Sequence, residues 1–174
     1  MAKNLSKLSN SADDLLAAHL RVLVVEDDEL SLDIITRWLK RLGYAHVCGL
    51  TNGVAGLGAC LQDPPELVIL DQQIPGPSGL AIAEHLRMSI PREQRPWTVL
   101  FTAACNATVM RLMGTGHFDD LLRKPCIGED YIAMLTRAHA GVRERRLITE
   151  PAERRETLRQ PHVAVCAAID APHA

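Results

Sequence analysis

The sequence predicts an α/β protein with a doubly wound, mostly parallel sheet and helices on both of its faces. Short apolar runs rich in valine, leucine and isoleucine recur five times along the chain, and stretches with helical spacing separate them. Two of the runs, 22–25 and 67–70, contain no polar residue, which is typical of strands buried on both faces. This alternation indicates a parallel sheet, and right-handed crossovers restrict it to a few strand orders.

The expected elements follow one another in a regular order. Strands are expected at 22–25, 46–50, 67–70, 98–101 and 118–122. The first helix presents one apolar stripe, made of Leu30, Ile34, Ile35, Trp38, Leu39 and Leu42. Gly43 follows this stripe and is expected to end the helix. Further helices are expected at 54–61, from an N-cap at Ser78 through Leu86, at 109–113, and from Gly128 onward.

Composition excludes several classes of protein. The chain has 174 residues, 47% of them hydrophobic, so it has room for one globular domain and is not disordered throughout. Its 19 basic and 21 acidic residues give a net charge of −2. Such a balance creates no strong field for nucleic acid or anionic lipid, so we expect neither DNA nor a membrane as a partner.

The cysteines and the apolar runs predict the compartment. Five cysteines are scattered, never closer than twelve residues, and form no Cys-x-x-Cys pattern, which excludes a disulfide framework or a zinc site of the usual spacing. The first residues lack the apolar stretch of a signal peptide, and no run approaches the ~20 apolar residues of a membrane span. We therefore expect a cytoplasmic protein.

Polar residues stand directly after four of the expected strands, where ligands bind in doubly wound sheets. They are the acidic run 26–29, then Asp71, Thr102 and the Lys124-Pro125 pair. The Gly-rich turns of dinucleotide folds and P-loops are missing after the first strand. Clustered carboxylates instead favour Mg²⁺. With that cation, Asp71 can act as a nucleophile toward phosphorus, while Lys124 and Thr102 neutralise charge on the transferred group.

Four segments in this order resemble the receiver domain of bacterial two-component response regulators. They are Val24-Val25-Glu26-Asp27, Leu67-Val68-Ile69-Leu70-Asp71 followed by Pro75-Gly76 and Gly79, then Phe101-Thr102-Ala103 and Lys124-Pro125. The resemblance implies a flavodoxin-like, five-stranded parallel sheet of order 2-1-3-4-5. It also implies Mg²⁺ as cofactor and an aspartate that is phosphorylated from a kinase phosphohistidine.

Carried over by position, the resemblance assigns a phosphoacceptor and a metal site. Asp71 resembles the phosphoacceptor, and Glu26 and Asp27 resemble the acidic pair. The backbone carbonyl of Gln73 would complete the metal ligands. The acidic run also allows Asp27 and Asp28 as the pair, although Glu26 and Asp27 are favoured because they close a buried strand.

The other two strand ends resemble the switch of the family. Thr102 resembles the switch hydroxyl, and Lys124 resembles the lysine that contacts the phosphoryl group, with a cis bond to Pro125. Leu121 stands where many receivers have a switch aromatic, which leaves that half of the switch in question. Gln72 is a second departure, because an apolar residue is common directly after the phosphoacceptor.

The expected organisation is an N-terminal arm at 1–20 able to hold a short helix, a receiver domain at 21–140, and a helical extension with a loose tail at 141–174. With no output domain expected, the prediction is a single-domain response regulator that catalyses only its own phosphorylation and dephosphorylation. Its expected partners are a sensor histidine kinase or a phosphotransfer protein, a downstream protein, and a second copy in a homodimer.

Two alternatives remain open. One is a receiver-like adaptor that binds partners without phosphorylation. The other is a small phosphohydrolase of the haloacid dehalogenase type, which needs an acid two residues after its nucleophile, where this chain has Gln73.

Overall fold

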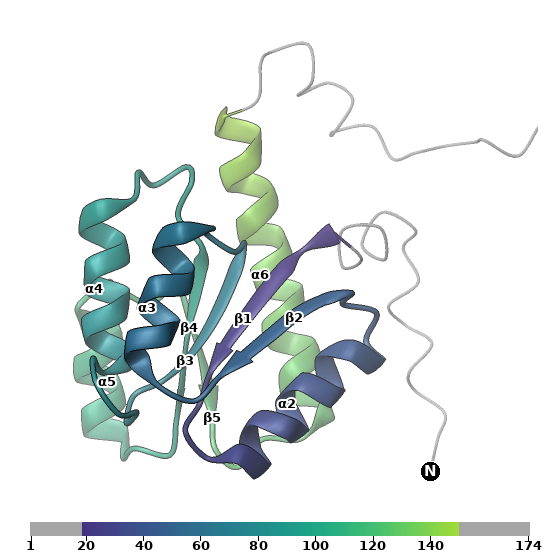
Figure 1. Ribbon diagram of the computed structural model, residues 1–174, viewed down its shortest axis with the longest axis vertical. Helices are drawn as coiled ribbons and strands as arrows, with labels where there is room; N and C mark the ends of the chain where they lie inside the picture. The colour runs from purple at the N-terminus through teal and green to yellow at the C-terminus, as the bar shows by residue number, and fades with distance from the viewer. Residues whose placement is uncertain (1–18, 150–174) are drawn as a thin grey trace, which may run out of the picture.

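The computed structural model describes residues 19–149, and the sheet within them has five parallel strands in the order β2-β1-β3-β4-β5. The strands are β1 (Arg21–Val25), β2 (His46–Leu50), β3 (Leu67–Asp71), β4 (Trp97–Thr102) and β5 (Asp120–Arg123). The helices are α2 (Glu29–Arg41), α3 (Gly53–Gln62), α4 (Gly79–Ser89), α5 (Asn106–Gly114) and α6 (Gly128–Thr149). The predicted doubly wound, flavodoxin-like fold and its strand order are confirmed (Figure 1).

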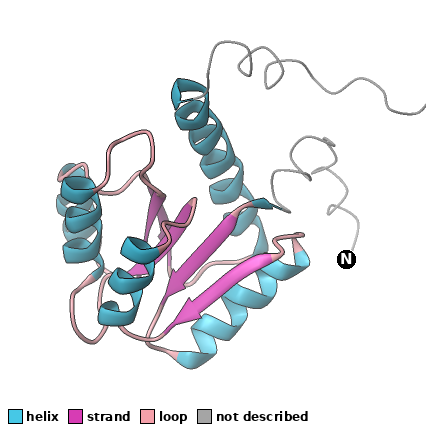
Figure 2. Ribbon diagram, turned by 45° about the horizontal axis from the view of Figure 1, so that its top comes forward, coloured by secondary structure: helices cyan, strands magenta, loops and turns pink. Residues whose placement is uncertain are grey.

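The helices form a layer on each side of the sheet, which is the twisted middle layer in Figure 2. On one side, α2 and α6 pack against Val22 and Val24 of β1. On the other side, α3, α4 and α5 pack against Leu23 and Val25 of the same strand. Side chains alternate between the two cores because successive residues of a strand point to opposite faces. This explains why β1 and β3 are apolar at nearly every position.

Local signals in the sequence set most helix ends. The Ser78 hydroxyl accepts a hydrogen bond from the Ala81 N–H at the start of α4, as predicted. Asn52 caps α3 in the same way through the Ala55 N–H. Gly43 follows α2 at φ +93°, a left-handed conformation that favours glycine and ends the helix as expected.

The fifth strand begins later than the apolar pattern predicts. The strand was expected at 118–122, whereas β5 runs Asp120–Arg123. Phe118 is buried in the core on the α3 side but lies in the loop before the strand. The carboxylate of Asp119 accepts a hydrogen bond from the Thr98 N–H at 2.8 Å, which holds this loop against β4. Burial of Phe118 thus reflects loop packing and not strand pairing.

The C-terminal end of α6 is hydrogen-bonded to the edge of the sheet where the strands begin. Arg145 donates hydrogen bonds to the carbonyls of Arg95 and Pro96 at 3.0 and 2.8 Å. It also pairs with Asp119 at 2.5 Å and lies over the Trp97 ring. The helix continues to Thr149. The expected N-terminal helix and C-terminal tail lie outside the described residues.

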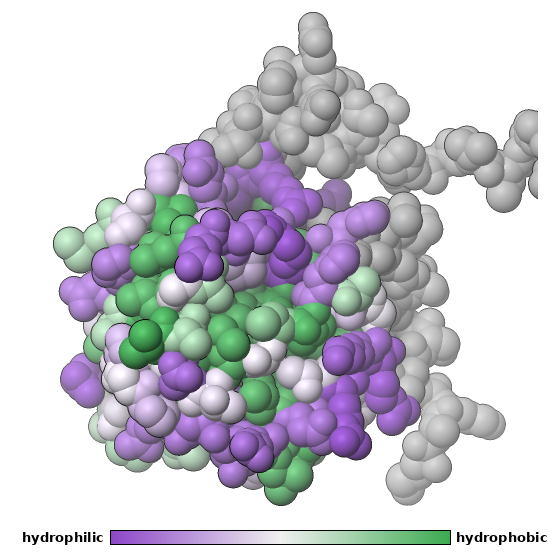
Figure 3. Space-filling model, in the orientation of Figure 1, coloured by the Kyte–Doolittle hydropathy of each residue, from purple (hydrophilic) through white to green (hydrophobic). Residues whose placement is uncertain are grey.

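Away from the strand ends, the described surface has an apolar area and a groove. Figure 3 shows apolar side chains across the middle of one face, with hydrophilic side chains around them. A groove of about 580 Å³ lies beside the start of β2, between that strand and the end of α3. Within the described region, no helix is both long and apolar enough to cross a membrane.

Candidate functional site

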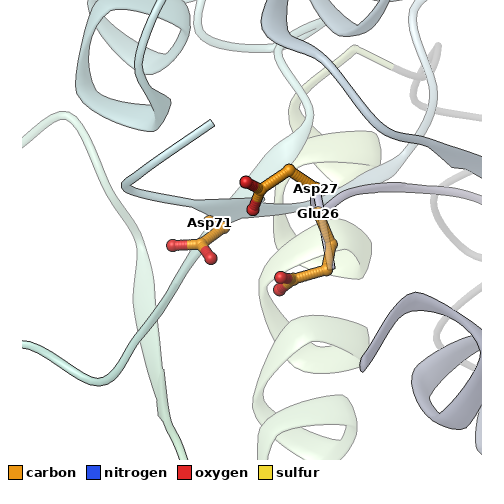
Figure 4. A group of neighbouring side chains, drawn as sticks. All are labelled: Glu26, Asp27 and Asp71. Atoms are coloured by element: carbon orange, nitrogen blue, oxygen red, sulfur yellow. The ribbon is translucent and has the colours of Figure 1, made fainter. Parts of the chain in front are cut away.

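Three carboxylates meet where β1 and β3 end. Glu26 and Asp27 follow β1, and Asp71 is the last residue of β3, which pairs with β1 in parallel. One oxygen from each carboxylate lies within 4.8 Å of the others, and the three groups face the same space in Figure 4. Glu26 and Asp71 are buried, whereas Asp27 is exposed. Two carboxylates of the cluster are therefore shielded from solvent, and the third is open to it.

Asp28 has a different role from its neighbours. Its side chain caps α2, because Oδ1 accepts a hydrogen bond from the Ser31 N–H at 2.7 Å. Hydrogen bonds from Ser31 lower the pKa of the Asp28 carboxyl. Of the two pairings that the acidic run allowed, the structure groups Glu26 and Asp27 with Asp71.

Lys124 supplies a positive charge inside this cluster. Its Nζ lies 2.6 Å from Oε2 of Glu26 and 2.6 Å from Oδ2 of Asp71. Burial lowers the pKa of Lys124, but hydrogen bonds to Asp71 and Glu26 outweigh it and raise the pKa overall. The peptide bond from Lys124 to Pro125 is cis, as the resemblance implied.

Burial raises the pKa of Glu26, and the negative charge of Asp71 adds to this effect. The hydrogen bond from Lys124 opposes it without cancelling it. Three carboxylates and one ammonium leave a formal charge of −2 in a small, partly buried volume. Oxygen ligands of this charge fit a hard divalent cation such as Mg²⁺.

The loop after Asp71 holds the aspartate in place. The Gln73 N–H donates to Oδ1 of Asp71 at 3.0 Å, so Gln73 lies beside the carboxylate cluster. Gln72, an unexpected residue at its position, accepts a hydrogen bond from the Leu80 N–H at 3.2 Å through its side-chain oxygen. It thereby satisfies a free N–H in the first turn of α4.

Gly79 belongs to the segments that carry the resemblance, and the structure shows the packing reason for a glycine there. A Cβ added at this position would lie 2.3 Å from the backbone oxygen of Asp71. The start of α4 can therefore approach the phosphoacceptor candidate this closely only with glycine. The Pro-Gly-rich loop before it was the signal in the sequence, but it does not reveal which glycine touches Asp71.

Thr102 lies at the end of β4, one strand further along the sheet. It is buried, and its hydroxyl accepts a hydrogen bond from the Ala104 N–H at 3.1 Å. Its backbone carbonyl accepts from the Lys124 N–H at 2.9 Å, which links the last two strand ends. Leu121, at the position of the missing aromatic, is partly buried against the core on the α3 side.

Phe101 was not predicted as a site residue. It is 3% exposed, and its ring centre lies 4.4 Å from Nζ of Lys124. Phe101 also pairs with Asp71 in the register of β3 and β4. The apolar run that contains it predicted a strand but gave no sign of contact with a lysine over twenty residues away.

Comparison with known proteins identifies the family that this arrangement matches. The family model described as "Response regulator receiver domain" matches residues 22–136. The chain is 35% identical over 113 residues to the aerobic respiration control sensor protein ArcB of Escherichia coli. It is 34% identical over 140 residues to the uncharacterized transcriptional regulatory protein YrkP of Bacillus subtilis.

The matched relatives are longer proteins. The ArcB match covers 65% of this chain and 14% of ArcB, and the YrkP match covers 79% of this chain and 55% of YrkP. The chain thus spans between about one seventh and about half of the length of these two relatives.

Solved structures share the fold. The receiver domain of sensor histidine kinase PA1611 from Pseudomonas aeruginosa, described with a magnesium ion in its active site cleft, matches with a TM-score of 0.62. That match has 20% identity and covers 70% of this chain and 98% of the other. The chemotaxis protein CheY4 of Vibrio cholerae matches with a TM-score of 0.61, 20% identity, and 68% and 98% coverage. At these identities the likeness shows the fold alone.

Proposed function

Because this chain belongs to the response regulator receiver domain family of two-component systems, we propose that it accepts a phosphoryl group on Asp71. The proposed donor is a phosphohistidine of a sensor histidine kinase or phosphotransfer protein. The P–N bond of the donor breaks with its electron pair returning to the imidazole, while a carboxylate oxygen of Asp71 forms the new P–O bond. The observation that carries this proposal is the Lys124 ammonium, 2.6 Å from that carboxylate.

In this proposal, Glu26, Asp27, Asp71 and the backbone carbonyl of Gln73 would hold Mg²⁺. Bound there, the ion supplies positive charge to the oxygens of the transferring group. The carboxylate cluster with its formal charge of −2 supports this assignment. Asp27 is exposed, so the cluster has a side from which a donor can approach.

Lys124 is proposed to contact the phosphoryl group once it is on Asp71. Transfer replaces the carboxylate charge of Asp71 by the larger charge of the phosphoryl oxygens. An ammonium already within 2.6 Å of Oδ2 has only a short distance to follow that charge. Such a preplaced cation stabilises charge where it develops during transfer.

Thr102 is the proposed switch. Its hydroxyl now accepts from the Ala104 N–H, so turning toward a phosphoryl oxygen would release that loop before α5. A packing change of this kind needs only a modest free-energy difference between two arrangements. The signal is proposed to reach a downstream protein through the surface around α5.

The four free cysteines among the described residues fit the proposed cytoplasmic location.

Labelling with radioactive acetyl phosphate and Mg²⁺ tests the proposal. Wild type and Asp33→Asn, a surface carboxylate change on α2, are expected to take up an alkali-labile, hydroxylamine-sensitive label. Asp71→Asn is expected to take up none. Equal labelling of Asp71→Asn and wild type would overturn the assignment, as would a lack of label in wild type.

Leu121 favours one second function, a receiver-like adaptor that binds partners without phosphorylation. Nothing aromatic is present at this position to move inward when Asp71 is modified. Amide chemical shifts along β5 and α5 that are unchanged by phosphorylation would favour the adaptor. The phosphohydrolase alternative has less support, because Gln73 offers no acid two residues after the nucleophile.

A further inference from the structure

The Lys124 ammonium lies between carboxylates and an aromatic ring. The carboxylates of Glu26 and Asp71 are each 2.6 Å from Nζ. The Phe101 ring centre is 4.4 Å from the same atom. Phe101 is fixed in the core that β4 shares with α2 and α6, where it is 3% exposed. The Phe101 ring is therefore held in a fixed position, and the Lys124 ammonium lies over it.

The ring and the carboxylates hold the ammonium in different ways. A cation is attracted to the face of an aromatic ring by the ring quadrupole, and the attraction grows when water is excluded. Lys124 is largely shielded, with 21% of its side chain exposed. The pull of each carboxylate changes whenever it binds a cation or becomes phosphorylated. The negative potential of the ring face is not altered by either event.

We infer that Phe101 is a positioning residue for phosphoryl transfer, because its ring face keeps the Lys124 ammonium beside the reacting carboxylate of Asp71. This inference rests on the proposed function. Phe101 touches no reacting atom and acts through Lys124 alone. The register supports this role, since Phe101 on β4 pairs with Asp71 on β3 and lies one residue before Thr102.

Two kinds of change at Phe101 test the inference. Phe101→Leu removes the ring and keeps an apolar side chain of similar bulk. Replacement by phenylalanines of increasing fluorine content keeps the shape and progressively removes the negative potential of the ring face. Phe118 provides a matched control, because it is also buried, at 5% exposure, but belongs to the opposite core.

The first readout is the rate of labelling by acetyl phosphate, corrected for the folded fraction of each variant. We expect Phe101→Leu to lower this rate about fivefold to tenfold, and fluorination at 101 to lower it in proportion to the fluorine content. The same changes at Phe118 are expected to leave the rate within about twofold of wild type. A merely structural role would affect stability at both positions and show no dependence on fluorine.

The second readout observes Lys124 directly and does not depend on phosphorylation. The chain has four lysines, Lys3, Lys7, Lys40 and Lys124, so ¹³C labelling of the lysine ε-carbon gives a simple spectrum. The ring current of Phe101 is expected to shift the Lys124 ε-protons upfield. Phe101→Leu is expected to abolish this shift, and Phe118→Leu is expected to preserve it.

The two readouts separate the inference from the proposed function. If wild type takes up label and the Phe101 variants match it, the inference is wrong while the function stands. If wild type takes up no label, the proposed function is wrong and the positioning role falls with it. If the upfield shift of Lys124 is absent, the inference is wrong whatever the labelling shows.

Discussion

Oε2 of Glu26 lies 2.6 Å from Nζ of Lys124, and the Glu26 side chain, a member of the carboxylate cluster, is almost wholly buried. Ionised acids are costly to bury, and a partner offsets this cost only with good geometry. Since burial raises the pKa of Glu26 despite this ion pair, the folded protein bears a net cost for the Glu26 charge. The buried charge of Glu26 thus lowers the stability of the folded protein.

Replacing Glu26 by glutamine is therefore expected to stabilise the protein in the absence of divalent cations. We expect the free energy of unfolding and the melting temperature to rise, because the buried charge of Glu26 is removed while Lys124 keeps its ion pair with Asp71. Thermal unfolding at pH 7.5 in EDTA measures the change. Glu84→Gln on the exposed face of α4 is the control and is expected to change little. A destabilised Glu26→Gln variant would contradict the prediction.

Mg²⁺ is expected to stabilise the wild type, because only the folded state holds the three carboxylates together where they can bind the ion. The bound ion would then offset the formal charge of −2 in the cluster. At a free concentration tenfold above the dissociation constant, the gain is about 1.4 kcal/mol. Asp27→Asn removes the exposed ligand and is expected to weaken this response, which a melting curve against Mg²⁺ concentration shows. EDTA should reverse the wild-type gain, and an Asp27→Asn curve that overlays the wild type would argue against a cation site.

Gly79→Ala is expected to destabilise the protein, since its Cβ would meet the Asp71 backbone oxygen at 2.3 Å. Overpacking of this kind costs about 2–3 kcal/mol, and relief of the contact must displace Asp71 or α4. We therefore expect labelling of Asp71 to slow as well. Urea unfolding and the labelling assay measure the two effects.

Gly58→Ala is the matched control for this change. Gly58 lies inside α3, and a Cβ added there meets no atom within 4 Å. Alanine favours a helix interior over glycine, so a gain of about 1 kcal/mol is expected with normal labelling. Similar behaviour of the two alanine variants would show that the close approach of α4 to Asp71 is unimportant.

The cysteines are expected to differ in their reaction with iodoacetamide. Hydrogen bonds from Thr108 lower the pKa of the exposed Cys105 thiol, whereas burial raises the pKa of Cys60 to about 12. The thiolate is the reactive form. Among the four described cysteines, Cys105 is thus expected to be alkylated first between pH 7 and 8, and Cys60 only after unfolding, which peptide mass spectrometry measures. Early alkylation of Cys60 in the folded protein would contradict the structure.

The sequence predicted the strand ends well and the contacts between them poorly. Asp71 and Lys124 could be found because each stands directly after an apolar run, and parallel strands bring such positions to one edge. Glu26 and Asp27 were favoured over Asp27 and Asp28 because they close a buried strand, and the structure groups these two with Asp71. The contact of Phe101 with Lys124 and that of Gly79 with Asp71 were not predicted, because a cation over a ring and a close backbone approach leave no periodic signal.

The path of α6 has a consequence for how this domain can be joined to others. The helix starts beside the carboxylate cluster and ends, through Arg145, at the opposite edge of the sheet, where β1 also begins (Figure 1). Covalent connections at residues 19 and 149 therefore leave from the edge remote from Asp71. A neighbour attached there need not obstruct the edge that carries Asp71. A domain with this arrangement can be joined to other domains within a longer chain. This is consistent with its match to only 14% of a longer sensor protein.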